Sequence, residues 1–385
     1  MVTSIRMRLF ALSTFGTFLV VAACSATANT PAPENGGPVV PSPVDAAPAT
    51  ASASPQRFFG PDDGPFALFS QGVTAPVPEE LQNNPEYQQL LTRDAIKPIY
   101  TPVITTKEDA QLDADDLVMG VSVDGESRAY PISTMRFKEI VNDELGRRPI
   151  LVTWCTLCYT GLVHERLVDG EPLLFGNQGA LYKGAMTWWD WKTQSVWSQP
   201  WGAAISGPLR GTALTLIPAS VVPWSTWEAE HPETTVLADI LDRERLRVQV
   251  ARDDFVIGVA LQESATAYDY CLAAARRVIN DRIGEHPVVV FVDPTNRDIK
   301  VFLRLPGTDL GLNGQKGKDS KELVFEIDED GQIIDAETGS RWDMTLGIAN
   351  EGPLKGIALQ QIPYVTSFDW AWSDFFPHTS FYEPD

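Results

Sequence analysis

The residues best suited to chemistry are two cysteines three positions apart, Cys155 and Cys158, in the stretch ILVTWCTLCYTGLVHER. Cysteine is scarce, with four among 385 residues, so a pair at this spacing needs an explanation. Two thiolates at this spacing suit copper(I) or half of a tetrahedral zinc site. They can also exchange between dithiol and disulfide, or form an inert pair. The spacing alone leaves metal binding, redox exchange and an inert pair open.

The sequence around the pair gives arguments for and against each of these alternatives. A CxxC disulfide closes a very small loop, so it constrains the unfolded chain little and makes a poor structural staple. The letters after the pair, YTGLVHERL, alternate in polarity as a strand does, and they offer no helix N-terminus to lower a thiol pKa. His164 is close in sequence, but six residues of extended strand would place it about 20 Å from Cys158 unless the chain turns back.

The elements that must position the pair belong to an internal repeat. A shift of 138 positions aligns residues 117–152 with 255–290 without a gap, and a shift of 145 aligns 190–218 with 335–363. A repeat of this size indicates two pseudo-symmetric domains rather than a solenoid. We therefore expect one unit over 113–245 and a second over 246–385, called here the first and second repeat.

Each repeat is expected to have the same order of elements. In the first repeat the pattern predicts strands over 117–123 and 127–131, a helix over 132–142, and a strand over 150–154. Asp169-Gly170 is a strong hairpin turn signal, and a short helix is expected around 224–231. The predicted fold class is α+β, dominated by strands, with two tandem copies of one fold.

The repeat also acts as an internal control on function, because residues needed only for folding should occur in both copies. Cys155 aligns with Asp293 and Cys158 with Asn296, so the second copy keeps the strand and lacks the thiols. The pair is therefore not required to fold the unit. By the same test Asp190, which recurs with its neighbours Thr193 and Ser195, is expected to be structural.

Tryptophans are concentrated near the pair, in the letters TWWDWKTQSVWSQPW. Trp197 recurs as Trp342 and is expected in the core. The others are specific to the first repeat, as the cysteines are. They suggest either extra core packing or a ligand pocket floored by the thiols. The candidate pocket residues are Trp154, Trp188, Trp189, Trp191, Trp201 and His164.

Two further features have simpler interpretations. Residues 326–337, EIDEDGQIIDAE, nearly fit a calcium loop, but a β-hairpin turning at Asp330-Gly331 fits better because no helices flank the segment. Cys271 stands alone in the expected helix of the second repeat, and we expect it to be a buried small residue.

The chain ends and the charge indicate location. Residues 1–24 have a basic start, an apolar run and small residues before Cys24, which is typical of a lipoprotein signal; an ordinary secretory signal is the alternative. Residues 25–62 form a Pro/Ala/Ser-rich tether, and 63–112 an N-terminal extension. The expected location is the periplasmic or extracellular face of a bacterial envelope. The formal net charge of −21 argues against a nucleic-acid partner.

Taken together, the motifs GVSVDGESRAYPI, EIVND, VTWCTLCYTG and TQSVWSQPWGAAISGPLRGTAL resemble the DUF3179 family of bacterial exported proteins, over about residues 93 to 382. The resemblance implies the fold and the location; the family has no established activity. This chain has Thr156 where the family has proline, Trp154 where it usually has tyrosine, and Lys138 where it often has histidine. A metal site that used the family's histidine is therefore not expected at position 138 of this chain.

Overall fold

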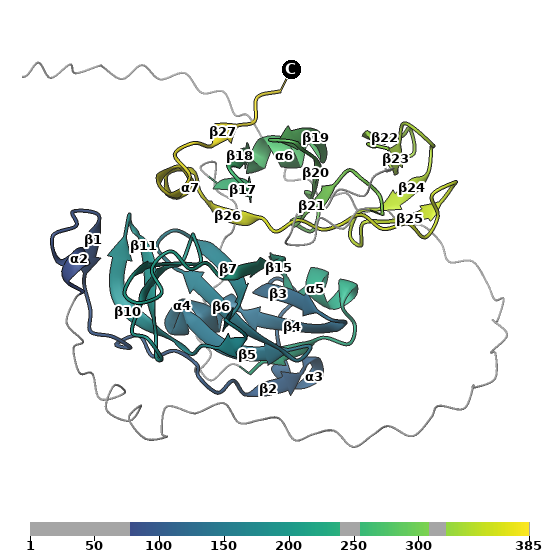
Figure 1. Ribbon diagram of the computed structural model, residues 1–385. Coiled ribbons are helices and arrows are strands. Elements are labelled where there is room, and N and C mark those ends of the chain that lie inside the picture. The colour runs from purple at the N-terminus through teal and green to yellow at the C-terminus, as the bar shows by residue number, and fades with distance from the viewer. Residues whose placement is uncertain (1–77, 239–254, 308–320, 385) are drawn as a thin grey trace, which may run out of the picture. The chain divides into compact units, whose positions relative to one another are not determined.

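The computed structural model describes residues 78–238, 255–307 and 321–384 (Figure 1). The predicted signal over 1–24 and the tether over 25–62 lie outside the described residues. All described residues belong to one compact unit. None of the helices in these ranges is long and apolar enough to cross a membrane.

The first repeat and the extension before it are built mainly from strands. Their strands are β1 (Tyr87–Gln89), β2 (Ile104–Thr106), β3 (Leu117–Val123), β4 (Glu126–Pro131), β5 (Ile140–Leu145), β6 (Arg148–Cys155), β7 (Thr160–Glu165), β8 (Leu167–Val168), β9 (Glu171–Pro172), β10 (Phe175–Tyr182), β11 (Ala185–Asp190), β12 (Val196–Ser198), β13 (Ala203–Ser206), β14 (Thr215–Ile217), β15 (Ala219–Pro223) and β16 (Thr235–Leu237). Their helices are α2 (Glu79–Gln82), α3 (Lys107–Ala110), α4 (Ile132–Lys138) and α5 (Trp224–Glu230).

These strands form three larger sheets with the orders β14-β7-β6-β5, β15-β3-β4-β16-β2 and β1-β10-β11-β12-β13. Strands β6 and β7 run through the middle of the first sheet, so the CxxC motif lies between two central strands. The extension adds an edge strand to two of the sheets, because β1 pairs with β10 and β2 pairs with β16. The turn predicted at Asp169-Gly170 joins β8 to β9, as expected.

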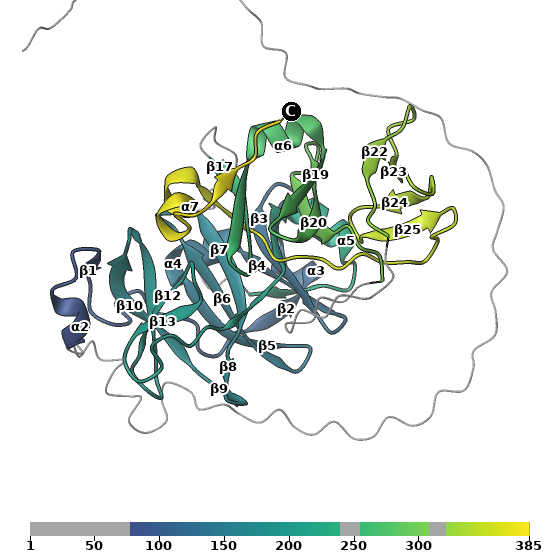
Figure 2. The same ribbon diagram turned by 45° about the horizontal axis from the view of Figure 1, so that its top comes forward.

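The described elements of the second repeat follow the same order as those of the first, but none of them corresponds to β8, β9 or β14. Its strands are β17 (Phe255–Leu261), β18 (Ser264–Asp269), β19 (Val278–Ile283), β20 (His286–Asp293), β21 (Asp298–Leu303), β22 (Phe325–Ile327), β23 (Ile333–Asp335), β24 (Arg341–Asp343), β25 (Ile348–Glu351), β26 (Val365–Phe368) and β27 (Ser380–Phe381). Its helices are α6 (Tyr270–Arg276) and α7 (Asp369–Phe375). Figure 2 shows α6 beside β19 and β20, the counterparts of α4, β5 and β6.

The side-chain networks of the two repeats match, which confirms the structural interpretation of the shared residues. Asp190 Oδ2 accepts hydrogen bonds from Thr193 Oγ1 at 2.7 Å and from Trp197 Nε1 at 3.0 Å. In the second repeat, Asp335 Oδ2 accepts the equivalent bonds from Thr338 and Trp342, both at 2.9 Å. A buried carboxylate bonded in this way ties a turn to the core. The prediction of a strand-dominated α+β fold in two tandem copies is confirmed.

One predicted helix is wrong in its length. The helix expected over 132–142 ends at Lys138, because Glu139 adopts a left-handed conformation with φ 59°. Ile140 then starts β5, which pairs with β6. The apolar residues at 140 and 141 are buried as part of a strand rather than of a helix. Two adjacent apolar residues are compatible with either element, so the sequence pattern did not separate helix from strand here.

Candidate functional site

The CxxC motif forms the connection between two strands. Cys155 is the last residue of β6 and pairs with Thr160, the first residue of β7. Cys158 lies in the four-residue turn between them. The chain therefore reverses within the motif, and no helix begins there, which agrees with the sequence reading. Strand β6 is buried along almost its whole length, so the motif is held at the end of a rigid central strand.

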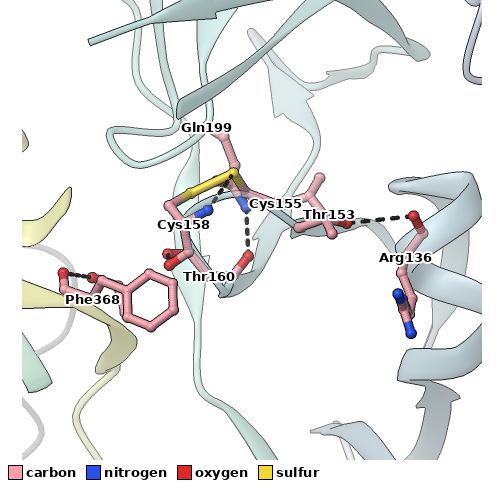
Figure 3. Close-up of a disulfide and its surroundings, with 9 residues drawn as sticks. Arg136, Thr153, Cys155, Cys158, Thr160, Gln199 and Phe368 are labelled. Atoms are coloured by element: carbon pink, nitrogen blue, oxygen red, sulfur yellow. Dashed lines mark hydrogen bonds between the residues drawn. A yellow bond between two sulfur atoms is a disulfide. The ribbon is translucent and has the colours of Figure 1, made fainter. Parts of the chain in front are cut away.

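Cys155 and Cys158 form a disulfide, with their Cα atoms 5.6 Å apart (Figure 3). The backbone N–H of Cys158 donates to Cys155 Sγ at 3.4 Å. The Cys158 carbonyl accepts from Thr160 Oγ1 at 3.1 Å and from the Phe368 N–H at 3.4 Å. In the dithiol state, a backbone N–H directed at one sulfur favours the thiolate on that sulfur. The structure thus distinguishes Cys155 from Cys158 electrostatically.

The two sulfurs also differ in what lies beside them. Both cysteines are buried, with exposed fractions of 1% for Cys155 and 0% for Cys158. Cys155 lines a cleft of about 280 Å³, whereas Cys158 does not line it and borders a separate cavity of about 10 Å³. The walls of the cleft are mainly aliphatic, and its polar lining comes from few side chains. The lining residues are Leu90, Leu91, Ile96, Arg136, Glu139, Cys155, Thr156, Leu157, Asn177, Gly179, Ala180, Leu181 and Met186. A mostly apolar cleft with a few convergent polar groups is typical of a small-molecule or peptide site.

Glu139 is the acidic residue of the cleft. Its carboxylate accepts a hydrogen bond from Asn177 Nδ2 at 2.6 Å. Burial raises the pKa of Glu139, and the bond from Asn177 opposes this shift without cancelling it. The backbone of Glu139 is fixed next to the disulfide strand, because its carbonyl accepts from the N–H of Trp154 at 2.9 Å.

A second buried carboxylate supports this arrangement from the N-terminal extension. Asp94 Oδ1 accepts from the backbone N–H of Asn177 at 2.7 Å, and Asp94 Oδ2 accepts from the Tyr100 hydroxyl at 2.7 Å. Burial is the main cause that raises the pKa of Asp94 to about 6. Sequence reasoning missed both Glu139 and Asp94. One usable signal was available for Glu139, since the second repeat has Arg277 at the aligned position.

His164 does not join the cysteines. It lies on β7 opposite Leu151, four residues before Cys155 on the paired strand. Its ring packs edge-on against Trp188 with centroids 5.6 Å apart, and burial lowers its pKa to about 3. The imidazole is therefore neutral at physiological pH.

The tryptophans of the predicted pocket do not line the cleft. Trp154, Trp188 and Trp189 are among the largest fully buried side chains, and Trp191 is nearly so. Trp201 is half-buried and donates from Nε1 to the Phe375 carbonyl at 3.0 Å. The structure therefore assigns these tryptophans to packing, which is the simpler of the two interpretations that the sequence left open. The cleft beside Cys155 is lined by aliphatic side chains instead, while Trp188 belongs to the buried cluster that contains both cysteines.

The remaining candidates are placed as follows. Residues 325–327 and 333–335 form the antiparallel pair β22–β23, so the hairpin at Asp330-Gly331 is confirmed. Cys271 is exposed on α6, one residue after the helix start, and the prediction that it is buried is wrong. In the described ranges, no three His, Cys, Asp or Glu side chains gather in a way that could hold a metal ion.

The fold and the site define a class: a duplicated strand-rich α+β unit in which one copy carries a disulfide beside an apolar cleft. The family model described as a protein of unknown function, DUF3179, matches residues 93–248 and again 242–379. The chain belongs to this family, as its motifs predicted, and the double match corresponds to the two repeats. No curated protein and no solved structure matches the chain.

Proposed function

We propose that this protein is a thiol–disulfide exchange protein whose redox couple is Cys155–Cys158. The observation that carries the proposal is the position of Cys155 in the wall of the cleft, which Cys158 does not line, although both residues are buried. An inert pair would need no such opening. The absence of the pair from the second repeat supports the same conclusion, because the fold forms without it.

The step that the geometry favours begins with a partner dithiol. One thiolate of the partner attacks Cys155 Sγ, which forms a mixed disulfide, and the bond to Cys158 breaks with its electron pair on Cys158. The second partner thiol then attacks the partner's own sulfur in the mixed disulfide and releases Cys155 as a thiolate. The partner dithiol is oxidised to a disulfide, and the protein's disulfide is reduced by two electrons. The partner's two protons balance the two new thiols.

We also propose that the reaction takes place outside the cytoplasm, on a body anchored through Cys24. Stable protein disulfides form in oxidising compartments, and the N-terminal sequence has the pattern of an exported lipoprotein. Globomycin treatment of the expressing cells, followed by palmitate labelling of the wild-type chain and of Cys24→Ser, tests the anchor. Labelling that persists in Cys24→Ser would contradict it.

The exchange is tested with single-cysteine chains. In a background with Cys24→Ser and Cys271→Ser, one chain keeps only Cys155 and its matched control keeps only Cys158. Both are treated with glutathione disulfide under native conditions, and the mixed disulfides are quantified by mass spectrometry. We expect the Cys155 chain to react at least about tenfold faster, because Cys155 borders the cleft and its thiolate is favoured by the Cys158 N–H.

Two results would overturn the proposal. One is a disulfide in the wild-type protein that dithiothreitol reduces only after the protein unfolds. The other is a reduced protein that retains one equivalent of copper or zinc, absent from Cys155→Ser/Cys158→Ser, which would make the pair a metal site.

A further inference from the structure

We infer that Glu139 is the proton-transfer residue of this site: its carboxylate accepts the proton of the incoming thiol and later returns it to the Cys155 thiolate. The inference rests on the proposed exchange at Cys155 and Cys158, and it assigns a role to Glu139, the first residue of the EIVND motif. It is argued from the position of Glu139 in the cleft, from its partners and from the comparison of the two repeats.

The position of Glu139 is fixed by the backbone. It follows helix α4, and its left-handed conformation turns the chain directly into β5. Its carbonyl pairs with the N–H of Trp154, the residue next to Cys155. Glu139 lines the same cleft as Cys155. A thiol that enters the cleft to reach Cys155 therefore passes a carboxylate held on the neighbouring strand.

The second repeat shows which features of position 139 belong to the fold and which are specific to the copy with the cysteines. Arg277 has the same left-handed conformation, with φ 62°, and its carbonyl accepts the equivalent bond from the Val292 N–H at 2.9 Å. The backbone geometry is thus common to both copies. The carboxylate is present only in the copy that has the cysteines, and an acidic side chain is not needed to form the turn.

The surroundings of Glu139 suit a group that exchanges a proton. Burial raises its pKa, which brings the carboxyl closer to neutral pH, where a general base is most effective. Asn177 Nδ2 donates to the carboxylate, and Asn177 Oδ1 accepts from the Gly179 N–H at 2.8 Å, which fixes the orientation of the amide. Asp94 holds the backbone of Asn177. The charged side chains near it are Arg136, which lines the cleft from α4, and Asp94, which lies behind Asn177 on the extension.

A proton carrier is useful here because a thiol attacks only as its thiolate, and most of an ordinary thiol is protonated at neutral pH. The carboxylate takes the proton from the partner's first thiol as its sulfur bonds to Cys155 Sγ. When the partner's second thiol releases Cys155, the protonated carboxyl gives that proton to Cys155. The proton of the partner's second thiol goes to the Cys158 thiolate. Glu139 therefore ends the cycle ionised, as it began.

The test compares full-length wild type with Glu139→Gln. Glutamine keeps the shape of the side chain and can still accept from Asn177, but it cannot take up a proton. The matched control is Glu144→Gln, which changes an exposed carboxylate on β5, the strand that begins directly after Glu139. Each disulfide is reduced by dithiothreitol from pH 5 to pH 9, and the reaction is trapped by alkylation and counted by mass spectrometry.

We expect the rate for Glu139→Gln to follow the thiolate fraction of dithiothreitol across this range. Wild type and Glu144→Gln should exceed that rate by about 100-fold at pH 6, the lower end of the usual contribution of a general base. At pH 9 the three proteins should converge, because the reagent is then largely thiolate. A purely structural role for Glu139 would change the rate equally at every pH.

The outcomes separate the two proposals. A wild-type disulfide that does not react in the folded protein overturns the exchange function, and the role of Glu139 with it. A reactive wild type whose pH profile is shared by Glu139→Gln overturns only the role of Glu139. If Glu139→Gln does not fold, Glu139→Ala takes its place in the same comparison, with thermal unfolding as the check on folding.

Discussion

The replacement His164→Phe should make the free energy of unfolding less sensitive to acid. His164 is fully buried, and burial lowers its pKa to about 3. Its Nδ1 has no hydrogen-bond partner among the described residues. The second repeat shows that phenylalanine fits this place, because Phe302 is the aligned residue. A glycine faces each ring: a Cβ on Gly202 would lie 2.4 Å from His164 Nε2, and a Cβ on Gly347 would lie 2.5 Å from Phe302 Cε1.

The magnitude follows from proton linkage. In the unfolded chain His164 titrates near its ordinary pKa of about 6.5. Between about pH 6.5 and about 3, the unfolded state therefore binds a proton that the folded state does not. The free energy of unfolding must then fall as the pH falls, by about 1.4 kcal/mol per pH unit for one proton. From pH 7 to pH 4 the loss attributable to His164 amounts to about 3 kcal/mol.

The assay is urea unfolding of wild type and His164→Phe at pH values from 4 to 7, followed by tryptophan fluorescence. Subtracting the two curves removes the common contributions of Asp94 and Glu139. The stability difference should grow in favour of the variant by about 3 kcal/mol as the pH falls to 4. The reciprocal control, Phe302→His, should gain the same acid sensitivity. A difference that stays constant over this range would refute the reasoning, because it would mean that His164 titrates alike in the folded and unfolded chains.

Two further predictions concern stability. Cys155→Ser/Cys158→Ser should lower the free energy of unfolding by only about 2 kcal/mol, since the disulfide closes a loop of a few residues; a urea-unfolding loss twice as large would show a structural staple. Gly120→Ala and Gly258→Ala should each lower the free energy of unfolding by about 3 kcal/mol in the same measurement. A Cβ at Gly120 would lie 2.2 Å from the Trp227 ring, and one at Gly258 would lie 2.3 Å from the Trp372 ring. Unchanged stability in both variants would contradict the close packing in both repeats.

Much of the fold was predictable because it follows from local sequence patterns and from the internal repeat. The alignment of the two copies identified the paired strands, the closing helices and the shared Asp190 network, since a residue that occurs twice in the same setting points to architecture. The turns at Asp169-Gly170 and Asp330-Gly331 followed from dipeptides with a strong conformational preference. The helix after Pro131 is predicted too long, because its end depends on the left-handed backbone conformation of Glu139. Glutamate has no conformational preference that would predict this.

The sequence by itself determined that this chain is a tandem duplication, that it belongs with DUF3179, and that Cys155 and Cys158 are specific to one copy. The tertiary structure decided what surrounds the cysteines. Glu139 follows α4, Asn177 lies on β10 and Asp94 belongs to the extension, and only the pairing of distant strands brings them together. It also placed the tryptophans in the core and aliphatic side chains along the cleft beside Cys155, because burial depends on which sheets pack face to face.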